Sequence, residues 1–184
     1  MFRTTRFTIA VIIAASSAFA ASAPGIKNFD QVDAHVYRGG QPTGEAFQYL
    51  AKLGVKTVID LREPGSRSAA EERIVTAAGM RYVNIPMTGL TAPTVIETAK
   101  ILDILEDATT GAVFVHCQRG ADRTGAVIAA YHIEHDKWDN AKALADAKAH
   151  SMSPFQFPRM SYIRTFRGRT IDAKVEPAAA PVAN

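Results

Sequence analysis

The chain alternates between short stretches rich in β-branched and aromatic residues and longer stretches whose apolar residues recur at three- and four-residue spacing. The first pattern is typical of strands and the second of amphipathic helices. The β-rich stretches predict strands at residues 35–38, 56–61, 81–85 and 112–116. The helical pattern covers residues 43–53, 68–78, 94–105, 126–133, 140–149 and 158–166.

This order of elements favours a single α/β domain. Strands that alternate with helices predict a mostly parallel sheet, because each parallel strand pair needs a crossover connection. We expect a central sheet of about four to five strands with helices on both faces. The last helical segments are not separated by strands, which predicts a helical cluster on one face. A length of 184 residues with 47% hydrophobic residues suits one domain of ordinary size.

The cysteine count and the charge exclude several classes of protein. The single Cys117 excludes an internal disulfide and a zinc site built on two or more cysteines. The formal net charge is only +3 and is not gathered into a basic tract. A nucleic-acid partner is therefore not expected.

The N-terminal segment has the pattern of a secretory signal peptide. Arg3 and Arg6 precede an apolar run over residues 7–15, and Ala18-Phe19-Ala20 matches a cleavage site. We expect cleavage after Ala20 and a periplasmic or secreted protein with no integral membrane span. The alternative is an uncleaved membrane anchor, although the run is shorter than the ~20 residues that span a bilayer. Residues 21–29 are then interpreted as a linker, 30–170 as the domain and 171–184 as a disordered tail.

The candidate chemistry lies in the segment His116–Gly125. The strand predicted at 112–116 delivers Cys117 into a short loop that turns at Gly120 and enters a helix. Backbone N–H groups of such a loop bind anions, and the adjacent helix N-terminus favours a thiolate over a thiol. Arg123 follows Cys117 by six residues and can present a two-pronged donor to a phosphate. The segment therefore combines a nucleophile, an anion cradle and a guanidinium group.

This segment resembles the signature loop H-C-x5-R-[ST] of the cysteine-dependent protein tyrosine and dual-specificity phosphatases. Residues 36–42, 59–62 and 82–87 are similar to the compact, atypical dual-specificity-like phosphatases, and the resemblance covers roughly residues 30–168. It implies that Cys117 forms a phosphocysteine intermediate and that Arg123 holds the phosphoryl oxygens. It also implies that no metal or other cofactor is needed. The residues implied to bind substrate are Gln118, Arg119, Gly120, Ala121 and Thr124, and Thr124 would hydrogen-bond the thiolate.

The general acid departs from the family pattern. Enzymes of this kind usually place an Asp after the strand that precedes the nucleophile strand, but residues 86–93 contain no carboxylate. Asp122, inside the signature loop, is the candidate that the sequence offers. The alternative role for Asp122 is a helix N-cap.

The sequence thus predicts an exported phosphatase that hydrolyses phosphomonoesters. The substrate is expected to be a phosphotyrosine-containing or other phosphorylated protein, or a polyphosphorylated small molecule of the inositol-phosphate type. Arg119 tilts this expectation towards polyanions. The alternative function is a catalytically weak module that binds phosphorylated ligands.

Four further hypotheses concern other side chains and other interpretations of the cysteine loop. His132 and His135 could face one metal ion, but no third ligand accompanies them, so surface or helix-end histidines are expected. Arg62 is either a site residue or part of a surface salt bridge. A nucleotide-binding P-loop is disfavoured because Ala126, not Lys, follows Gly125. A rhodanese-like sulfur transferase is disfavoured because its cysteine loop is normally shorter.

Overall fold

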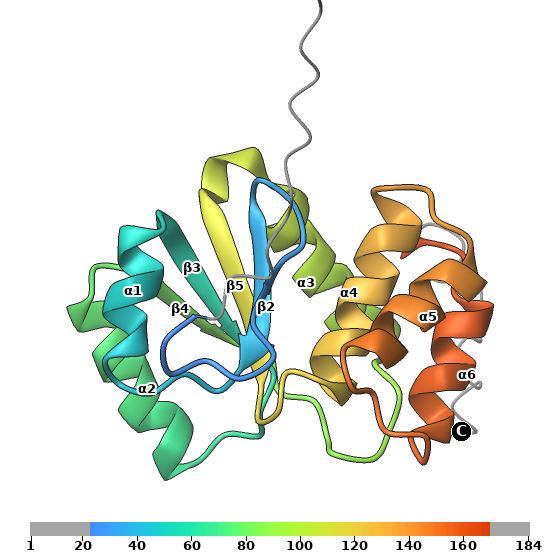
Figure 1. Cartoon of the computed structure of the whole chain (residues 1–184), viewed down its shortest axis with the longest axis horizontal. Coiled ribbons are helices and arrows are strands. Elements are labelled where there is room, and N and C mark those ends of the chain that lie inside the picture. The colour runs from blue at the N-terminus through green and yellow to red at the C-terminus, as the bar shows by residue number, and fades with distance from the viewer. Residues whose placement is uncertain (1–22, 170–184) are drawn as a thin grey trace, which may run out of the picture.

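The computed structural model describes residues 23–169, which form a five-stranded sheet covered by helices on both faces (Figure 1). The strand order is β1-β2-β5-β3-β4, and only the edge pair β1–β2 is antiparallel. This confirms the α/β class and the mostly parallel sheet. The strands are β1 (Asp30–Gln31), β2 (Val36–Gly40), β3 (Val55–Asp60), β4 (Arg81–Asn84) and β5 (Ala112–Cys117).

The helices form two layers around the sheet and a third layer outside it (Figure 1). Helices α1 and α2 pack on one face, and α3 and α4 on the other. Helices α5 and α6 contact α4 from outside and form the expected helical cluster. A short 3-10 turn covers residues Ala108–Thr110. The helices are α1 (Ala46–Lys52), α2 (Ser66–Ala77), α3 (Val95–Glu106), α4 (Asp122–Glu134), α5 (Asn140–Ala149) and α6 (Phe157–Thr165).

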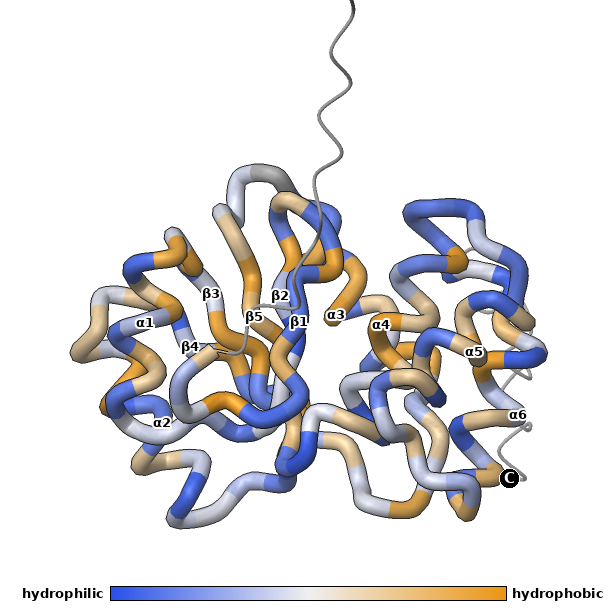
Figure 2. The backbone as a smooth tube through the Cα atoms, in the orientation of Figure 1, coloured by the Kyte–Doolittle hydropathy of each residue, from blue (hydrophilic) through white to orange (hydrophobic). Residues whose placement is uncertain are grey.

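Strand β5 lies at the centre of the sheet because its side chains are apolar on both faces. Val113 and Val115 pack under α3 and α4, whereas Phe114 packs under α1 and α2. Figure 2 shows hydrophobic segments along parts of β3 and β5 and hydrophilic ones in many outer loops. Helix α4 is buried along most of its length because it is covered by the sheet on one side and by α5 and α6 on the other.

The structure differs from the expected elements at two helix starts, in one additional strand and in the linker. Helix α4 begins at Asp122, one turn before the apolar segment at residues 126–133, and α1 begins at Ala46 instead of residue 43. Strand β1 was not predicted, because two residues are too few to show an alternating pattern. The described part of the predicted linker contributes to the core, since Ala23 and Ile26 are buried. The interpretation as a linker is therefore wrong for residues 23–29.

The predicted signal peptide and the predicted disordered tail lie outside the described residues. Within residues 23–169, no helix has both the length and the apolar character needed to cross a bilayer.

Candidate active site

The signature loop lies at the carboxyl end of the parallel strands, where β5 leads into α4 (Figure 1). Ligands of open α/β sheets bind at this edge. Cys117 is the last residue of β5 and pairs in register with Gly40 of β2, on the neighbouring strand. The cysteine is only 3% exposed, so its sulfur sits at the floor of the loop and not on its rim.

Two glycines allow the loop to pack directly on β2. Gly120 has a φ of 72°, and a Cβ atom there would lie 2.3 Å from the carbonyl carbon of Gly39. The Gly120 carbonyl accepts hydrogen bonds from Asn28 Nδ2 at 2.9 Å and from Arg38 at 3.3 Å. The Gly120 carbonyl and the Ala121 N–H belong to the same trans peptide and point in opposite directions. The Ala121 N–H is therefore directed away from Asn28 and Arg38. The contact with β2 thus fixes the shape of the anion cradle.

The thiol of Cys117 is set up to ionise. Burial acts to raise its pKa, but a hydrogen bond from the Thr124 side chain, the backbone N–H groups of Thr124 and Arg119, and the charge of Arg123 together outweigh burial. The pKa of Cys117 is therefore lowered from its ordinary value. The Thr124 hydroxyl is buried and bonds no oxygen or nitrogen among the described residues, which leaves it to the sulfur.

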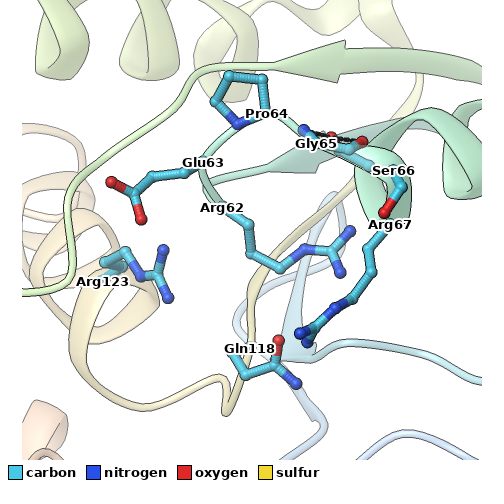
Figure 3. A pocket seen from close by; sticks show the side chains of 9 residues that line it. Arg62, Glu63, Pro64, Gly65, Ser66, Arg67, Gln118 and Arg123 are labelled. Atoms are coloured by element: carbon cyan, nitrogen blue, oxygen red, sulfur yellow. Dashed lines mark hydrogen bonds between the residues drawn. The ribbon is translucent and has the colours of Figure 1, made fainter.

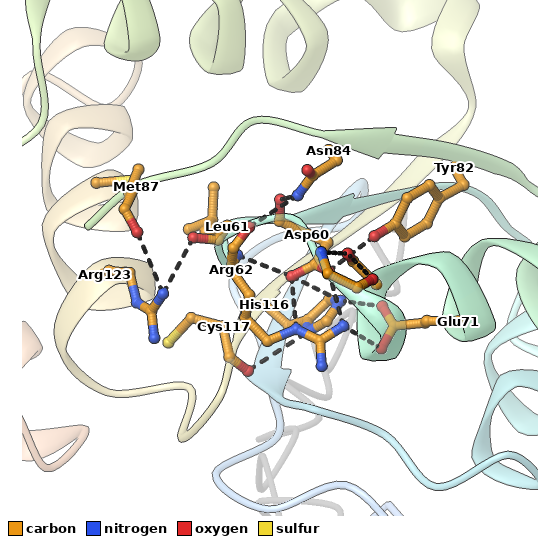
Figure 4. Close-up of polar contacts among 12 residues, drawn as sticks. Asp60, Leu61, Arg62, Glu71, Tyr82, Asn84, Met87, His116, Cys117 and Arg123 are labelled. Carbon is orange, nitrogen blue, oxygen red and sulfur yellow. Dashed lines mark hydrogen bonds and ion pairs between the residues drawn. The ribbon is translucent and has the colours of Figure 1, made fainter. Parts of the chain in front are cut away.

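Arg123 is held beside the sulfur by two backbone carbonyls (Figure 4). Its Nη1 donates to the carbonyls of Leu61 at 3.3 Å and Met87 at 3.2 Å. Its Nε and Nη2 make no protein hydrogen bond within residues 23–169, so they can hold an oxyanion. The fork geometry of a guanidinium group suits two oxygens of one phosphate.

A buried network of charges lies beneath the loop (Figure 4). Arg62 donates to both oxygens of Asp60 at 2.8 and 2.7 Å and to Glu71 at 2.7 Å. His116 Nε2 lies 2.7 Å from Glu71, and His116 Nδ1 lies 3.3 Å from the Cys117 carbonyl oxygen. Although burial opposes it, the bonds from Arg62 lower the pKa of Asp60, helped by His116 and Tyr82. The network connects α2 to the residue before the nucleophile and keeps β5 in place.

The structure decides the open hypothesis on Arg62. The side chain is 7% exposed and belongs to this network, so it is not part of a surface salt bridge. Asp60, Glu71 and His116 are also the described residues that bring three potential metal ligands within reach of one ion. The Arg62 guanidinium already bonds both carboxylates. It therefore supplies the positive charge that a metal ion would otherwise bring to this cluster.

Asp122 has both carboxylate oxygens engaged. Oδ1 accepts from the Ser153 N–H at 2.8 Å, and Oδ2 pairs with Arg119. The N-cap of α4 is Ala121, so the interpretation of Asp122 as an N-cap is wrong. Its carboxylate instead ties the loop to the segment between α5 and α6. An acid role for Asp122 stays a prediction.

The segment between β3 and α2 also belongs to the site, although none of its residues except Arg62 was expected there. Residues 62–68 line an open pocket of about 330 Å³ together with Gln118 and Arg123 (Figure 3). Glu63 and Arg67 lie in this wall, and both are exposed. The signal was available in principle, because β3 ends beside β5 in a parallel sheet. Pro64 and Gly65 in this segment indicate only a break after the strand, and no local pattern marks the segment as part of a site.

His132, in the last turn of α4, and His135, its C-cap, stack on different aromatic rings but both approach Asp136. His132 bonds Asp136 at 2.5 Å and stacks on Trp138, whereas His135 stacks on Tyr131. His132 is buried, and both histidines lie at the C-terminal end of α4, which agrees with the expected helix-end position. Asp136 also lies 4.0 Å from His135 Nε2, but among the described residues these three side chains do not come close enough together to hold one metal ion.

Comparisons with known proteins agree with this geometry. A family model described as "DSP-PTPase phosphatase fused to NAD+ Kinase" matches residues 17–165. The phosphatidylglycerophosphate phosphatase PTPMT2 of Arabidopsis thaliana is 31% identical over 124 residues, which are 66% of this chain and 54% of PTPMT2. The chain spans about half or less of the length of the curated relatives it matches.

Two solved structures share the fold. The crystal structure of P. aeruginosa TpbA superposes with a TM-score of 0.68 at 21% identity, covering 84% of this chain and 98% of TpbA. The catalytic domain of the PP-IP phosphatase SIW14 from S. cerevisiae superposes with a TM-score of 0.71 at 20% identity, covering 83% and 93%. Because the family model covers most of the chain, including the whole signature loop, the chain belongs to the DSP-PTPase family of phosphatases.

Proposed function

We propose that this protein is a cysteine-dependent phosphatase that hydrolyses phosphomonoesters without a metal ion. The observation that carries the proposal is the position of Cys117, a buried thiol with a lowered pKa at the floor of the loop. Arg123 stands beside it with two unused donor groups. A phosphate bound to the loop would therefore meet a nucleophile and fixed positive charge at once.

In the first step, the Cys117 thiolate attacks phosphorus. The S–P bond forms while the P–O bond to the leaving group breaks, and a phosphocysteine results. Backbone N–H groups of residues 118–124 and the guanidinium of Arg123 hold the three non-bridging oxygens. Because these donors are fixed before the reaction, they stabilise charge in the transition state with little reorganisation.

In the second step, a water molecule attacks the phosphocysteine. The S–P bond breaks, inorganic phosphate leaves and the thiolate is restored. The hydrogen bond from Thr124 lowers the free energy of the departing thiolate, for the same reason that it lowers the pKa of Cys117.

The leaving oxygen needs a proton in the first step, and two carboxylates are candidates. Asp122 is bound from two sides by Ser153 and Arg119. Glu63 is exposed, pairs with no described residue, and points towards Arg123 across the pocket (Figure 3). We therefore favour Glu63 as the proton donor, with Asp122 as the alternative. The same group would accept the proton of the attacking water in the second step.

The substrate proposal follows from the charge around the loop. Structural relatives include TpbA in complex with pTyr and the PP-IP phosphatase SIW14. Arg62, Arg67 and Arg123 line the pocket beside the loop, and Arg119 is exposed at its mouth. We propose a multiply charged substrate, and we favour one of the inositol-phosphate type over a phosphoprotein.

We also propose that the protein is exported. The basic pair Arg3 and Arg6, the apolar run and the Ala18-Phe19-Ala20 motif support this location. A single cysteine suits an oxidising compartment, since it has no partner within the chain for a disulfide.

Cys117 and Arg123 are tested with p-nitrophenyl phosphate in the presence of EDTA. Cys117→Ser should lose turnover while it still binds inorganic phosphate in calorimetry. Arg123→Lys should fold normally and lose roughly 10²–10³-fold in kcat, because a point charge does not replace a bidentate clamp. Undiminished turnover by Cys117→Ser would overturn the mechanism. A wild-type protein that binds phosphate without turnover would indicate the binding module.

The role of Thr124 is tested by the pH dependence of alkylation. The Thr124→Ala variant loses a hydrogen bond to the thiolate, so the pKa of Cys117 should rise. The midpoint of iodoacetamide reactivity should then move to higher pH, and the acid limb of the kcat/KM profile should move with it. Thr109→Ala, on the exposed turn after α3, is the matched control and should leave the midpoint in place. An unchanged midpoint in Thr124→Ala would mean that this hydroxyl does not bond the sulfur.

The proton donor is identified by comparing Glu63→Gln and Asp122→Asn on two esters. Loss of the acid should slow an alkyl phosphate by about 10²-fold or more but hardly affect p-nitrophenyl phosphate, whose leaving group needs no proton. We expect this selectivity for Glu63→Gln. Asp122→Asn should lower the melting temperature and slow both esters alike, because it weakens the tie to Ser153. If Asp122→Asn instead slows mainly the alkyl phosphate and Glu63→Gln does not, Asp122 is the acid.

Export is tested by mass spectrometry of the N-terminus. Protein recovered from the native host should begin at Ala21 and lie outside the cytoplasm. An intact Met1 start in the membrane fraction would contradict cleavage and favour the anchor.

A further inference from the structure

The pocket beside the signature loop carries more positive charge than one phosphate requires. Its wall contains the guanidinium groups of Arg62, Arg67 and Arg123, and Glu63 is its one carboxylate (Figure 3). The volume of about 330 Å³ extends from Arg123 and Gln118 along residues 62–68. Arg123 serves the phosphate above Cys117 and Arg62 pairs with Asp60 and Glu71, so Arg67 and the Nη1 of Arg62 remain to be explained.

Arg62 contributes a buried donor without a partner. Its Nε and Nη2 are used by Asp60 and Glu71, but its Nη1 is buried and bonds no described residue. The side chain is 7% exposed and lines the pocket. Buried N–H groups are nearly always paired, so this donor indicates a ligand or water at the pocket floor.

The N-terminus of α2 forms another part of the same wall. Gly65 is its N-cap, and Ser66, Arg67 and Ser68 make up its first turn. The first N–H groups of a helix have no partner inside the helix, and the helix dipole favours an anion there. No acidic residue occupies this first turn, so the positive end of this twelve-residue helix is uncompensated.

Arg67 reaches back from this turn over the pocket. Its guanidinium lies towards Gln118 and on the same side as the Arg62 guanidinium (Figure 3). Within residues 23–169, Arg67 forms no ion pair. Arg62 is already paired with Asp60 and Glu71, so Arg67 is the uncompensated positive charge, and it lies beside the unpartnered Nη1 of Arg62. An anion bound between the two groups would pair with Arg67 and accept from that Nη1.

We propose that this pocket is a second anion-binding subsite, formed by Arg62, Arg67 and the N-terminus of α2. It would hold a second phosphate group of a substrate whose first phosphate lies over Cys117. The proposal rests on the function proposed above and narrows the substrate to a polyphosphorylated small molecule. A peptide is disfavoured because Pro64 is the only apolar side chain in the wall, which offers little to a peptide's apolar groups.

The test compares KM values for myo-inositol hexakisphosphate and p-nitrophenyl phosphate. Arg67→Gln removes a charge from the subsite, and Ser66→Asp adds a negative charge at the start of α2. Each variant should raise KM for the hexakisphosphate by roughly tenfold and change KM for the aryl phosphate much less. An acidic residue in a first helical turn stabilises the helix, so Ser66→Asp should keep its melting temperature. Arg73→Gln, two turns along α2, is the matched control and should change neither KM.

The outcomes separate the subsite from the function. Equal KM changes for both substrates, or none, would overturn the subsite while leaving the phosphatase intact. A wild-type protein without Cys117-dependent turnover of the aryl phosphate would overturn the function instead. Calorimetry would then still show whether Arg67 contributes to binding, by comparing the affinity of Cys117→Ser for the hexakisphosphate with and without the additional Arg67→Gln substitution. If the Arg67 effect appears only with a doubly phosphorylated peptide, or only with phosphatidylinositol bisphosphate in vesicles, the assignment to a soluble small molecule is wrong.

Discussion

Cys117 is only 3% exposed, so the negative charge of its thiolate has to be stabilised by protein groups that are already in place. Water cannot solvate a sulfur at the floor of the loop, so burial alone would keep Cys117 protonated. The Thr124 hydroxyl, the loop N–H groups and Arg123 reverse that effect. Each of these depends on the exact course of the chain between β5 and α4. The geometry of this loop is therefore the constraint that the rest of the fold serves.

Both halves of the molecule contribute to that geometry. On the sheet side, the contact between Gly120 and Gly39 and the bond from Arg38 press the loop onto β2. On the helical side, Arg38 pairs with Asp146 of α5 at 3.3 Å, and Asp122 accepts from the N–H of Ser153. A local change in either layer would thus reach the anion cradle through a few short contacts. This explains why polar side chains as large as Arg38 are buried at an active-site edge.

The sequence was sufficient for features that are local in the chain. Strand and helix periodicities predicted the layered α/β fold, and the spacing from Cys117 to Arg123 predicted the loop because both residues act within it. What it could not predict depends on residues that meet only after folding. Glu71 reaches His116 from another element, and Ser153 binds Asp122 from 31 residues away. The N-cap interpretation of Asp122 was wrong because it rested on the nearby start of a helix. The actual partner, Ser153, is distant in the sequence, and no local pattern predicts that contact.

The missing carboxylate after β4 has a structural counterpart. The Thr88 and Gly89 carbonyls accept from Arg159 of α6 at 2.5 and 2.8 Å, and the Met87 carbonyl accepts from Arg123. This segment is thus held through its backbone by two arginines and supplies anchor points where the family resemblance implies an acid. The next segment at the same edge is the one after β3, which is the direct neighbour of β5 in the sheet. It carries both Glu63 and the start of α2, so proton donation and recognition of a second phosphate would come from one connection. Such an arrangement would couple the two tasks, because a substrate that reaches the start of α2 also passes Glu63.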